Sequence, residues 1–182
     1  MQTIFAAPMR SSANQSPAPE HLERHSFITI RPAVCHDIPE IMELERQSPA
    51  AAHWSEKEYR RLVESAERLV LIAEDGPSTA TDVISPVALG FLVARHIPPD
   101  WELENIVVAA TSQRQGIASR LLEALFARAR EAMSDAIFLE VRESNTPARA
   151  LYVKAGFRLQ AKRKSYYTGP VEDAILYSFK LR

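Results

Sequence analysis

One amphipathic helix placed between two strands constrains this fold more than any other feature. Residues 112–131 read SQRQGIASRLLEALFARARE, and from Ile117 onward apolar side chains recur at helical spacing. The stripe that they form consists of Ile117, Ala118, Leu121, Leu122, Leu125, Phe126 and Ala129. The spacing therefore predicts a helix that packs this stripe against a sheet.

The segments on either side of this helix determine how the sheet is connected. Residues 102–108 (ELENIVV) and 136–141 (AIFLEV) are both typical of strands. A helix that joins two strands of one sheet forms a crossover, and crossovers of this length join parallel strands. The sequence therefore predicts one parallel pair.

Further strand and helix patterns fill the rest of the chain. Strands are expected at 27–31, 68–75, 87–96, 157–167 and 173–181, and helices at 38–47, 55–67 and 146–155. Asp37 is expected to cap the first of these helices, Ser55 to form a capping box with Glu58, and Gly156 to end the last helix. Turns at Pro98-Pro99 and at 168–170 predict antiparallel neighbours. The predicted fold is α/β, with a mixed, mostly antiparallel sheet of about seven strands and helices on both faces.

Composition indicates one ordinary globular domain. The chain has 182 residues, 46% of them hydrophobic and 25% charged, and no apolar run approaches the ~20 residues needed to cross a bilayer. We expect a flexible tail at 1–25, a single domain at 26–182 and a loop at 76–86. A formal net charge of -1 gives no reason to expect nucleic acid or a membrane as partner. With no signal-peptide pattern and one cysteine, Cys35, interpreted as packing, we expect a cytoplasmic protein.

The start of the helix at Ile117 is a candidate anion site. A helix N-terminus presents free N–H groups and the positive end of a dipole, and phosphate suits both. Gly116 leaves the backbone approachable, Ala118 keeps the helix edge small, and Arg114 can add a charged contact. Neither the phosphate-binding loop pattern nor the three-glycine dinucleotide pattern is present. A polar helix start without any ligand is the alternative.

Four blocks in order resemble a known family. QRQGIA at 113–118 is similar to the acetyl-CoA signature of the GCN5-related N-acetyltransferase (GNAT) superfamily. LEVRESNTPARALYVKAGF at 139–157, HWSEKEY at 53–59 and YYTGPVEDAI at 166–175 resemble its RimI-type branch, which acetylates the N-terminal alanine of a ribosomal protein. The resemblance covers residues 27–182 and implies the GNAT fold, in which two parallel strands splay apart. It departs from the family at AATS (109–112), where many members carry proline and an aromatic residue, and in a shorter turn after Tyr167.

The resemblance implies direct transfer from acetyl-CoA to an amine, with no metal and no acyl-enzyme. It assigns coenzyme contacts to Ile106, Val107, Val108, Gln113, Arg114, Gln115, Gly116, Ile117, Ala118, Ser119, Asn145 and Tyr152. A backbone N–H near Val108 would stabilise the charge that develops on the thioester oxygen. Asn145 is also expected to cap its helix.

Two side chains are implied as catalytic. An α-amino group has a pKa near 8 and a lysine one near 10.4, so a base must remove a proton, and the resemblance assigns this role to Glu140, directly or through water. Glu102 and Glu104 are rivals, and a surface ion pair with Arg142 is the alternative reading of Glu140. Tyr152 would protonate the departing thiolate, although an aromatic ring packed on the sheet explains it equally well.

The acceptor side is the least defined part of the prediction. The resemblance places Trp54, Tyr59, Glu102, Tyr166 and Tyr167 beside the acceptor, although all the aromatic residues could be packing. Glu172 and Asp173 could attract a cationic N-terminus or shape a hairpin turn. We expect a protein N-terminus as acceptor, in a monomer or weak homodimer; a small amine or lysine acceptor, and a non-catalytic acyl-CoA-binding module, are the alternatives.

Overall fold

The computed structural model describes residues 28–48, 51–76 and 86–182. Its strands are β1 (Ile28–Pro32), β2 (Arg68–Asp75), β3 (Val87–Ile97), β4 (Asp100–Val108), β5 (Ala136–Arg142), β6 (Arg158–Thr168) and β7 (Val171–Lys180). Its helices are α1 (Ile38–Arg46), α2 (Glu56–Glu64), α3 (Ile117–Glu131) and α4 (Thr146–Lys154), with short 3-10 turns at Cys35–Asp37 and Ala110–Ser112. The predicted order of elements is confirmed, while the predicted tail and most of the predicted loop lie outside the described residues.

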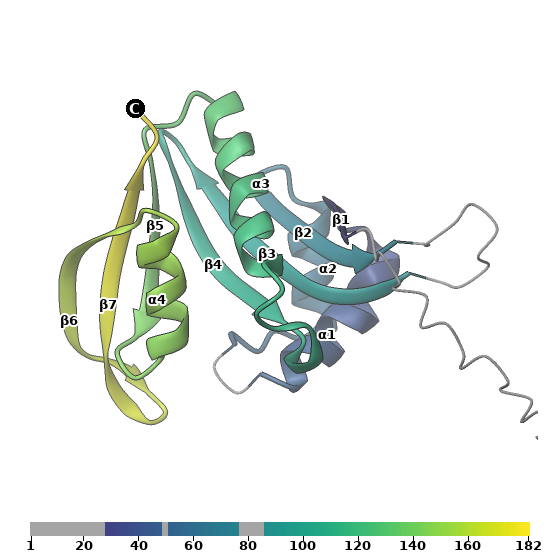
Figure 1. Cartoon of the computed structure of the whole chain (residues 1–182), viewed down its shortest axis with the longest axis horizontal. Helices are drawn as coiled ribbons and strands as arrows, with labels where there is room; N and C mark the ends of the chain where they lie inside the picture. Colours follow the sequence, from purple (N-terminus) through teal and green to yellow (C-terminus); the bar gives the residue numbers. More distant parts are fainter. Residues whose placement is uncertain (1–27, 49–50, 77–85) are drawn as a thin grey trace, which may run out of the picture.

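The strands form one mixed sheet in the order β1-β2-β3-β4-β5-β7-β6 (Figure 1). Every neighbouring pair is antiparallel except β4 and β5, which are parallel and connected through α3. The crossover argument from the sequence is therefore correct, and so are the two predicted hairpins.

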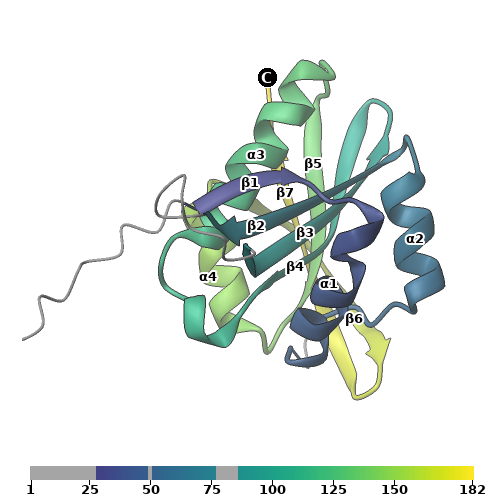
Figure 2. The same cartoon turned by 90° about the vertical axis from the view of Figure 1, so that its right-hand side faces the viewer.

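Helices cover both faces of the sheet (Figure 2). The stripe on α3 packs into a core with β2 to β5, β7 and α4, and Leu121, Leu125 and Ala129 are fully buried there. On the other face, α1 and α2 enclose a second core around Ile41 and Phe91. Full burial of one such aliphatic or aromatic side chain contributes about 1.5–3 kcal/mol. Within the described ranges, no helix is long and apolar enough to span a membrane.

The helix ends follow local chemistry as predicted, with one exception described below. Ser55 Oγ accepts the N–H of Glu58 at 3.3 Å, and the Glu58 carboxylate accepts the N–H of Ser55 at 2.7 Å. Asn145 Oδ1 accepts the N–H of Ala148 at 3.2 Å, which caps α4. Gly156 follows α4 with φ of 96°, a conformation that glycine adopts without strain.

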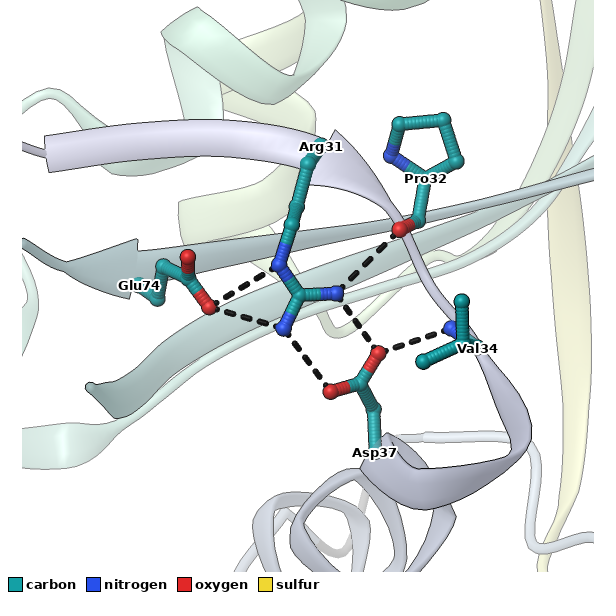
Figure 3. Close-up of polar contacts among 5 residues, drawn as sticks. All are labelled: Arg31, Pro32, Val34, Asp37 and Glu74. Carbon is teal, nitrogen blue, oxygen red and sulfur yellow. Dashed lines mark hydrogen bonds and ion pairs between the residues drawn. The ribbon is translucent and has the colours of Figure 1, made fainter. Parts of the chain in front are cut away.

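Asp37 does not cap α1, contrary to the prediction. The 3-10 turn before α1 gives it a helical backbone conformation, and its carboxylate accepts two hydrogen bonds from Arg31, at 2.7 and 2.8 Å. It also accepts the N–H of Val34 at 2.7 Å, while Arg31 binds Glu74 on β2 (Figure 3). The bonds from Arg31 hold the pKa of Asp37 below its usual value. Asp37 therefore ties the edge strand β1 to the start of α1.

Candidate active site

A bulge in β4 opens the sheet between its two parallel strands. Val93 pairs with Asn105 and Ala94 pairs with Leu103, so Glu104 is an extra residue in β4. Pairing between β4 and β5 ends at the same point, at Leu103 and Leu139. A bulge bends its strand and increases the local twist, so β4 turns away from β5 beyond Leu103 (Figure 1). The splayed parallel pair is thus present, and the bulge gives it a physical cause.

A cleft of about 330 Å³ lies where the two strands separate. Its walls come from the segment after α1, from β4 and β5, from α4 and from β6. The lining residues are Ser48, Ala51, Ala52, Leu103, Glu104, Asn105, Ile106, Glu140, Val141, Arg142, Asn145, Ala148, Tyr152 and Tyr167. Five residues predicted for the site are thereby brought together: Ile106, Glu140, Asn145, Tyr152 and Tyr167.

Glu140 occupies the first position of β5 beyond the paired segment. Its side chain is 16% exposed, and Oε1 lies 2.6 Å from Nη1 of Arg163 on β6. A hydrogen bond to Glu140 raises the pKa of the Tyr166 hydroxyl. Arg142, the partner suggested by the sequence, instead binds Glu172 at 3.3 Å. The reading of Glu140 as a surface partner of Arg142 is therefore wrong.

Two further carboxylates lie on β4 near Glu140. Glu104 forms an ion pair with Arg68 of β2. Burial raises the pKa of Glu102, and the negative charges of Glu104 and Glu140 raise it further. A carboxyl group with a raised pKa is a better proton acceptor near neutral pH, so Glu102 is a physically credible rival to Glu140. Glu102 does not line the cleft.

Tyr152 combines a packed ring with a place in the cleft wall. The residue is 6% exposed, and its ring lies 5.7 Å from that of Phe157 and 6.4 Å from that of Tyr177. Burial raises the pKa of its hydroxyl well above the ordinary value. Tyr152 therefore keeps its proton at neutral pH, as a proton donor must. The packing role and the catalytic role are compatible.

The start of α3 remains open to solvent. Gly116 is exposed with φ of 80°, Arg114 has φ of 62°, and no side chain caps the helix. Among the described residues, no atom outside the immediate chain neighbours lies within 4 Å of the position that a Cβ on Gly116 would occupy. Gln113 donates to the carbonyl of Val108 at 3.5 Å, which connects this loop to the end of β4. The loop thus offers free N–H groups and one guanidinium to an anion.

The end of β4 directs backbone N–H groups toward the side on which β5 no longer pairs. The N–H of Ala109 bonds to Leu89 on the β3 side at 2.9 Å. Because bonding direction alternates along a strand, the N–H groups of Val108 and Ile106 point away from β3, toward the side where β5 no longer pairs. Val107 is buried and points its side chain into the α1–α2 core. A contact with coenzyme from this segment would therefore use main-chain atoms.

The residues predicted for the acceptor side occupy different environments. Tyr59 is fully buried, and its hydroxyl donates to Glu45 at 2.6 Å, so it can act on a substrate only through that carboxylate. Trp54 packs edge-on against Tyr59 and lines a separate groove near α1. Tyr166 is 48% exposed and lies edge-on to Tyr167. Only Tyr167 of this group lines the cleft itself.

Glu172 and Asp173 shape the β6–β7 hairpin, which was one of the two roles considered for them. Glu172 accepts the N–H of Ser144 at 2.6 Å and binds Arg142, while Asp173 accepts the N–H of Ser165 at 2.8 Å and binds Lys162 at 3.0 Å. These bonds hold the pKa of both carboxyl groups below the usual values. Their charges are compensated by protein groups, which leaves little for an acceptor.

Sequence reasoning assigned no role in the site to four polar side chains around the cleft. Arg163 binds Glu140, and Arg142 lies over the ring of Tyr167 at 4.1 Å. Buried Glu45 accepts an N–H of Asn105 at 3.4 Å. Only Glu45 left a signal in the sequence, because it follows Ile38 and Ile41 at the spacing of the buried face of α1.

Cys35 and metal binding give no further candidates. Cys35 is partly buried, packs on the α1–α2 core and does not line the cleft. Among the residues that the structure describes, no group of three or more His, Cys, Asp or Glu side chains could hold a metal ion.

Known proteins resemble the chain over most of its length. A sequence model of the acetyltransferase (GNAT) family matches residues 38–157. The [ribosomal protein bS18]-alanine N-acetyltransferase of Escherichia coli K12 is 30% identical over 149 residues, which cover 80% of this chain and 92% of that protein. The crystal structure of the ribosomal-protein-S18-alanine N-acetyltransferase from Escherichia coli aligns with a TM-score of 0.69 and 28% identity, over 85% of this chain and 94% of that chain.

A more distant structure has a similar fold. Arabidopsis thaliana NAA60 in complex with acetyl-CoA aligns with a TM-score of 0.75 over 85% of this chain and 98% of that chain, at 18% identity. The family match, the relatives and the splayed sheet agree with the motifs of the sequence. The chain therefore belongs to the acetyltransferase (GNAT) family and is an N-acetyltransferase.

Proposed function

We propose that this enzyme transfers the acetyl group of acetyl-CoA directly to the α-amino group of a protein N-terminus. The observation that carries the proposal is the cleft between β4 and β5, which Glu140 and Tyr152 line together from different elements. A carboxylate and a protonated phenol in one cleft are the base and acid that such a transfer needs. The names of the relatives make an alanine at the N-terminus of a ribosomal protein the first acceptor to test.

The open start of α3 fits the pyrophosphate of coenzyme A. Gly116 presents no side chain to block approach, and Arg114 is free to add a charged contact. From there the loop leads to Val108 at the end of β4 and, across the cleft, to Asn145 at the start of α4. Acetyl-CoA, when bound, supplies the acetyl group as a reactive thioester.

Three groups of this chain carry the chemistry that we propose. Glu140 accepts a proton from the amine, directly or through a water molecule. The N–H of Val108 stabilises negative charge that develops on the thioester oxygen, as fixed backbone donors do in other acyl transfers. Tyr152 gives its proton to the departing sulfur. Cys35 lies outside the cleft lining, so the transfer proceeds without a cysteine acyl-enzyme.

Proton equilibria favour an α-amine over a lysine as acceptor. At pH 7 about 10% of an α-amino group with a pKa near 8 is neutral, against about 0.04% of a lysine with a pKa near 10.4. A smaller fraction of α-amines than of lysines therefore reaches the site in the protonated form, from which a proton must be removed. Glu140, which lines the cleft and whose ion-pair partner Arg163 is half exposed, still favours arrival of the cationic form.

An acceptor panel tests this proposal. Turnover of acetyl-CoA is measured with a peptide that begins with alanine, the same peptide with a blocked N-terminus and an internal lysine, and polyamines. We expect the free alanine peptide to be the best acceptor by kcat/KM. Preference for the lysine peptide or polyamines would contradict the proposed acceptor. Binding of acetyl-CoA without any turnover would indicate a non-catalytic module. Calorimetry that detects no acetyl-CoA binding would contradict the coenzyme assignment.

A further inference from the structure

Arg163 reaches the proposed base from two strands away. It lies on β6, the outer strand of the sheet, whereas Glu140 lies on β5, and β7 runs between them. In the register, Arg163 is opposite Ala174 of β7, and Glu140 is opposite Leu176 of the same strand. The strand between them carries the small side chain of Ala174 at this position, and Arg163 Nη1 comes within 2.6 Å of Glu140 Oε1.

An irregularity in β6 directs a second group to the same carboxylate. Between the pairs Arg163–Ala174 and Tyr167–Glu172, β6 has three residues where β7 has one. Ser165 at its centre has φ of 52°. The bulge brings the ring of Tyr166 to 5.5 Å from the Arg163 guanidinium, and the nearby Glu140 raises the pKa of the Tyr166 hydroxyl. The edge strand thus places a cation on the proposed base and a tyrosine beside it.

The ion pair of Arg163 differs from the neighbouring pair in its exposure. Arg68 and Glu104 are 20% and 18% exposed, so both partners are held within the protein. Arg163 is 52% exposed, while Glu140 is 16% exposed. A guanidinium that is half in water gains little from its pair, because solvent screens the attraction and hydrates the released cation. Arg163 can therefore leave Glu140 when another cation arrives.

We propose that Arg163 is an exchangeable counterion of Glu140, displaced by the ammonium group of the acceptor, and that it thereby sets acceptor affinity. This inference rests on the proposed function, because it requires the acceptor amine to reach Glu140. Before binding, the guanidinium compensates the negative charge in the cleft. On binding, the acceptor ammonium replaces the guanidinium at the Glu140 carboxylate. An acceptor without a positive charge cannot form this ion pair and gains no affinity from it.

Once Arg163 has moved away, the acceptor ammonium meets the negative charge of Glu140 without a competing protein cation. The other charged or titratable groups around this carboxylate, among the described residues, are Glu102, Glu104, Arg142, Tyr166 and Tyr167. Arg142 is engaged by Glu172, and Glu104 by Arg68. None of these replaces the direct contact with Arg163.

Peptide binding to three variants separates this role from a structural one. Affinity is measured by calorimetry in the presence of coenzyme A, which carries no acetyl group, with an alanine-starting peptide and with the same peptide acetylated at its N-terminus. The variants are Arg163→Gln, Arg163→Lys and Arg158→Gln, the last a control because Arg158 is an exposed arginine on the same strand with no ion pair among the described residues. Thermal unfolding checks that all three fold.

We expect Arg163→Gln to bind the free-amine peptide about 1.5- to 5-fold more tightly, the range that corresponds to an exposed ion pair. Its affinity for the acetylated peptide should not change. Arg163→Lys and Arg158→Gln should resemble the parent protein. Unchanged or weaker binding of the free-amine peptide, or an equal gain with the acetylated peptide, would overturn the inference. If the parent protein acetylates no amine at all, that result would instead contradict the proposed function.

Discussion

The buried hydrogen bond between Tyr59 and Glu45 allows a quantitative test of what holds the residues predicted for the acceptor side in place. Glu45 is 3% exposed and accepts hydrogen bonds from the Tyr59 hydroxyl at 2.6 Å, the Trp54 N–H at 3.2 Å and Asn105 Nδ2 at 3.4 Å. Tyr59→Phe keeps the ring that packs on Trp54 and Phe91 and removes only the shortest of these bonds. A hydrogen bond to a charged group contributes about 1.5–3 kcal/mol, so we expect the free energy of unfolding to fall by that amount at neutral pH.

The loss should also depend on pH. Burial raises the pKa of Glu45 above its usual value, and the bond from Tyr59 opposes this shift, so Tyr59→Phe raises the pKa further. Between the unfolded pKa and a higher folded pKa, the folded state binds more protons than the unfolded state, and stability falls as pH rises. The variant should therefore lose more stability at pH 8 than at pH 5.

Urea unfolding followed by circular dichroism at pH 5 and pH 8 measures both effects. Tyr177→Phe is a suitable control, because Tyr177 is also buried and, among the described residues, its hydroxyl accepts a hydrogen bond only from Arg149, at 3.5 Å. The control should lose less than about 1 kcal/mol, with no difference between the two pH values. If Tyr59→Phe behaves like the control, the hydroxyl does not stabilise an ionised Glu45, and the reasoning is refuted.

Four shorter predictions concern the cleft and the coenzyme loop. Gly90→Ala would place a Cβ 2.6 Å from the carbonyl oxygen of Val107, so unfolding should show a loss of about 1–3 kcal/mol, and KM for acetyl-CoA should rise. Gly116→Ala forces alanine to a φ near 80°, at about 1–2 kcal/mol, and calorimetry should show weaker acetyl-CoA binding with little change elsewhere. Glu140→Gln should lower kcat/KM by about 10²- to 10⁴-fold, most strongly below neutral pH, and unchanged kinetics would assign the proton to another group. Tyr152→Phe should lower kcat. Because burial raises the pKa of Tyr152, the pH profile of the parent enzyme should show no loss of activity from ionisation of Tyr152 below about pH 10, the ordinary tyrosine value.

Local sequence rules predicted the elements of the fold because each rule depends on neighbouring residues. The apolar stripe of α3, the Asn145 cap and the glycine after α4 all involve contacts within a few positions. Asp37 shows where such rules fail. Its position before Pro39 fits a cap, but Arg31, which itself binds Glu74 on another strand, offers its carboxylate a stronger, charge-assisted pair of bonds.

The bulge in β4 could not be predicted from its sequence. Residues 100–108 (DWELENIVV) are compatible with a regular strand, and nothing in them marks Glu104 as an extra residue. The bulge exists because β3 and β4 pair in two registers, on either side of Glu104. As a result Asn105 and Val107 face the α1–α2 core, whereas Trp101 and Leu103 face the core with α3. The opening of the cleft is therefore a property of strand pairing.

This difference between local and long-range causes also separates the two halves of the site. The coenzyme loop, residues 113–119, is contiguous and acts largely through its main chain, so a short motif suffices to predict it. The acceptor side depends on partners far apart in sequence: Glu140 with Arg163, and Glu45 with Asn105. Substitutions at Arg163 or Glu45 leave residues 113–119 unchanged, so acceptor preference can change while acetyl-CoA affinity is retained. A variant at Arg163 that lost acetyl-CoA binding would show that the two halves are coupled more closely than these contacts indicate.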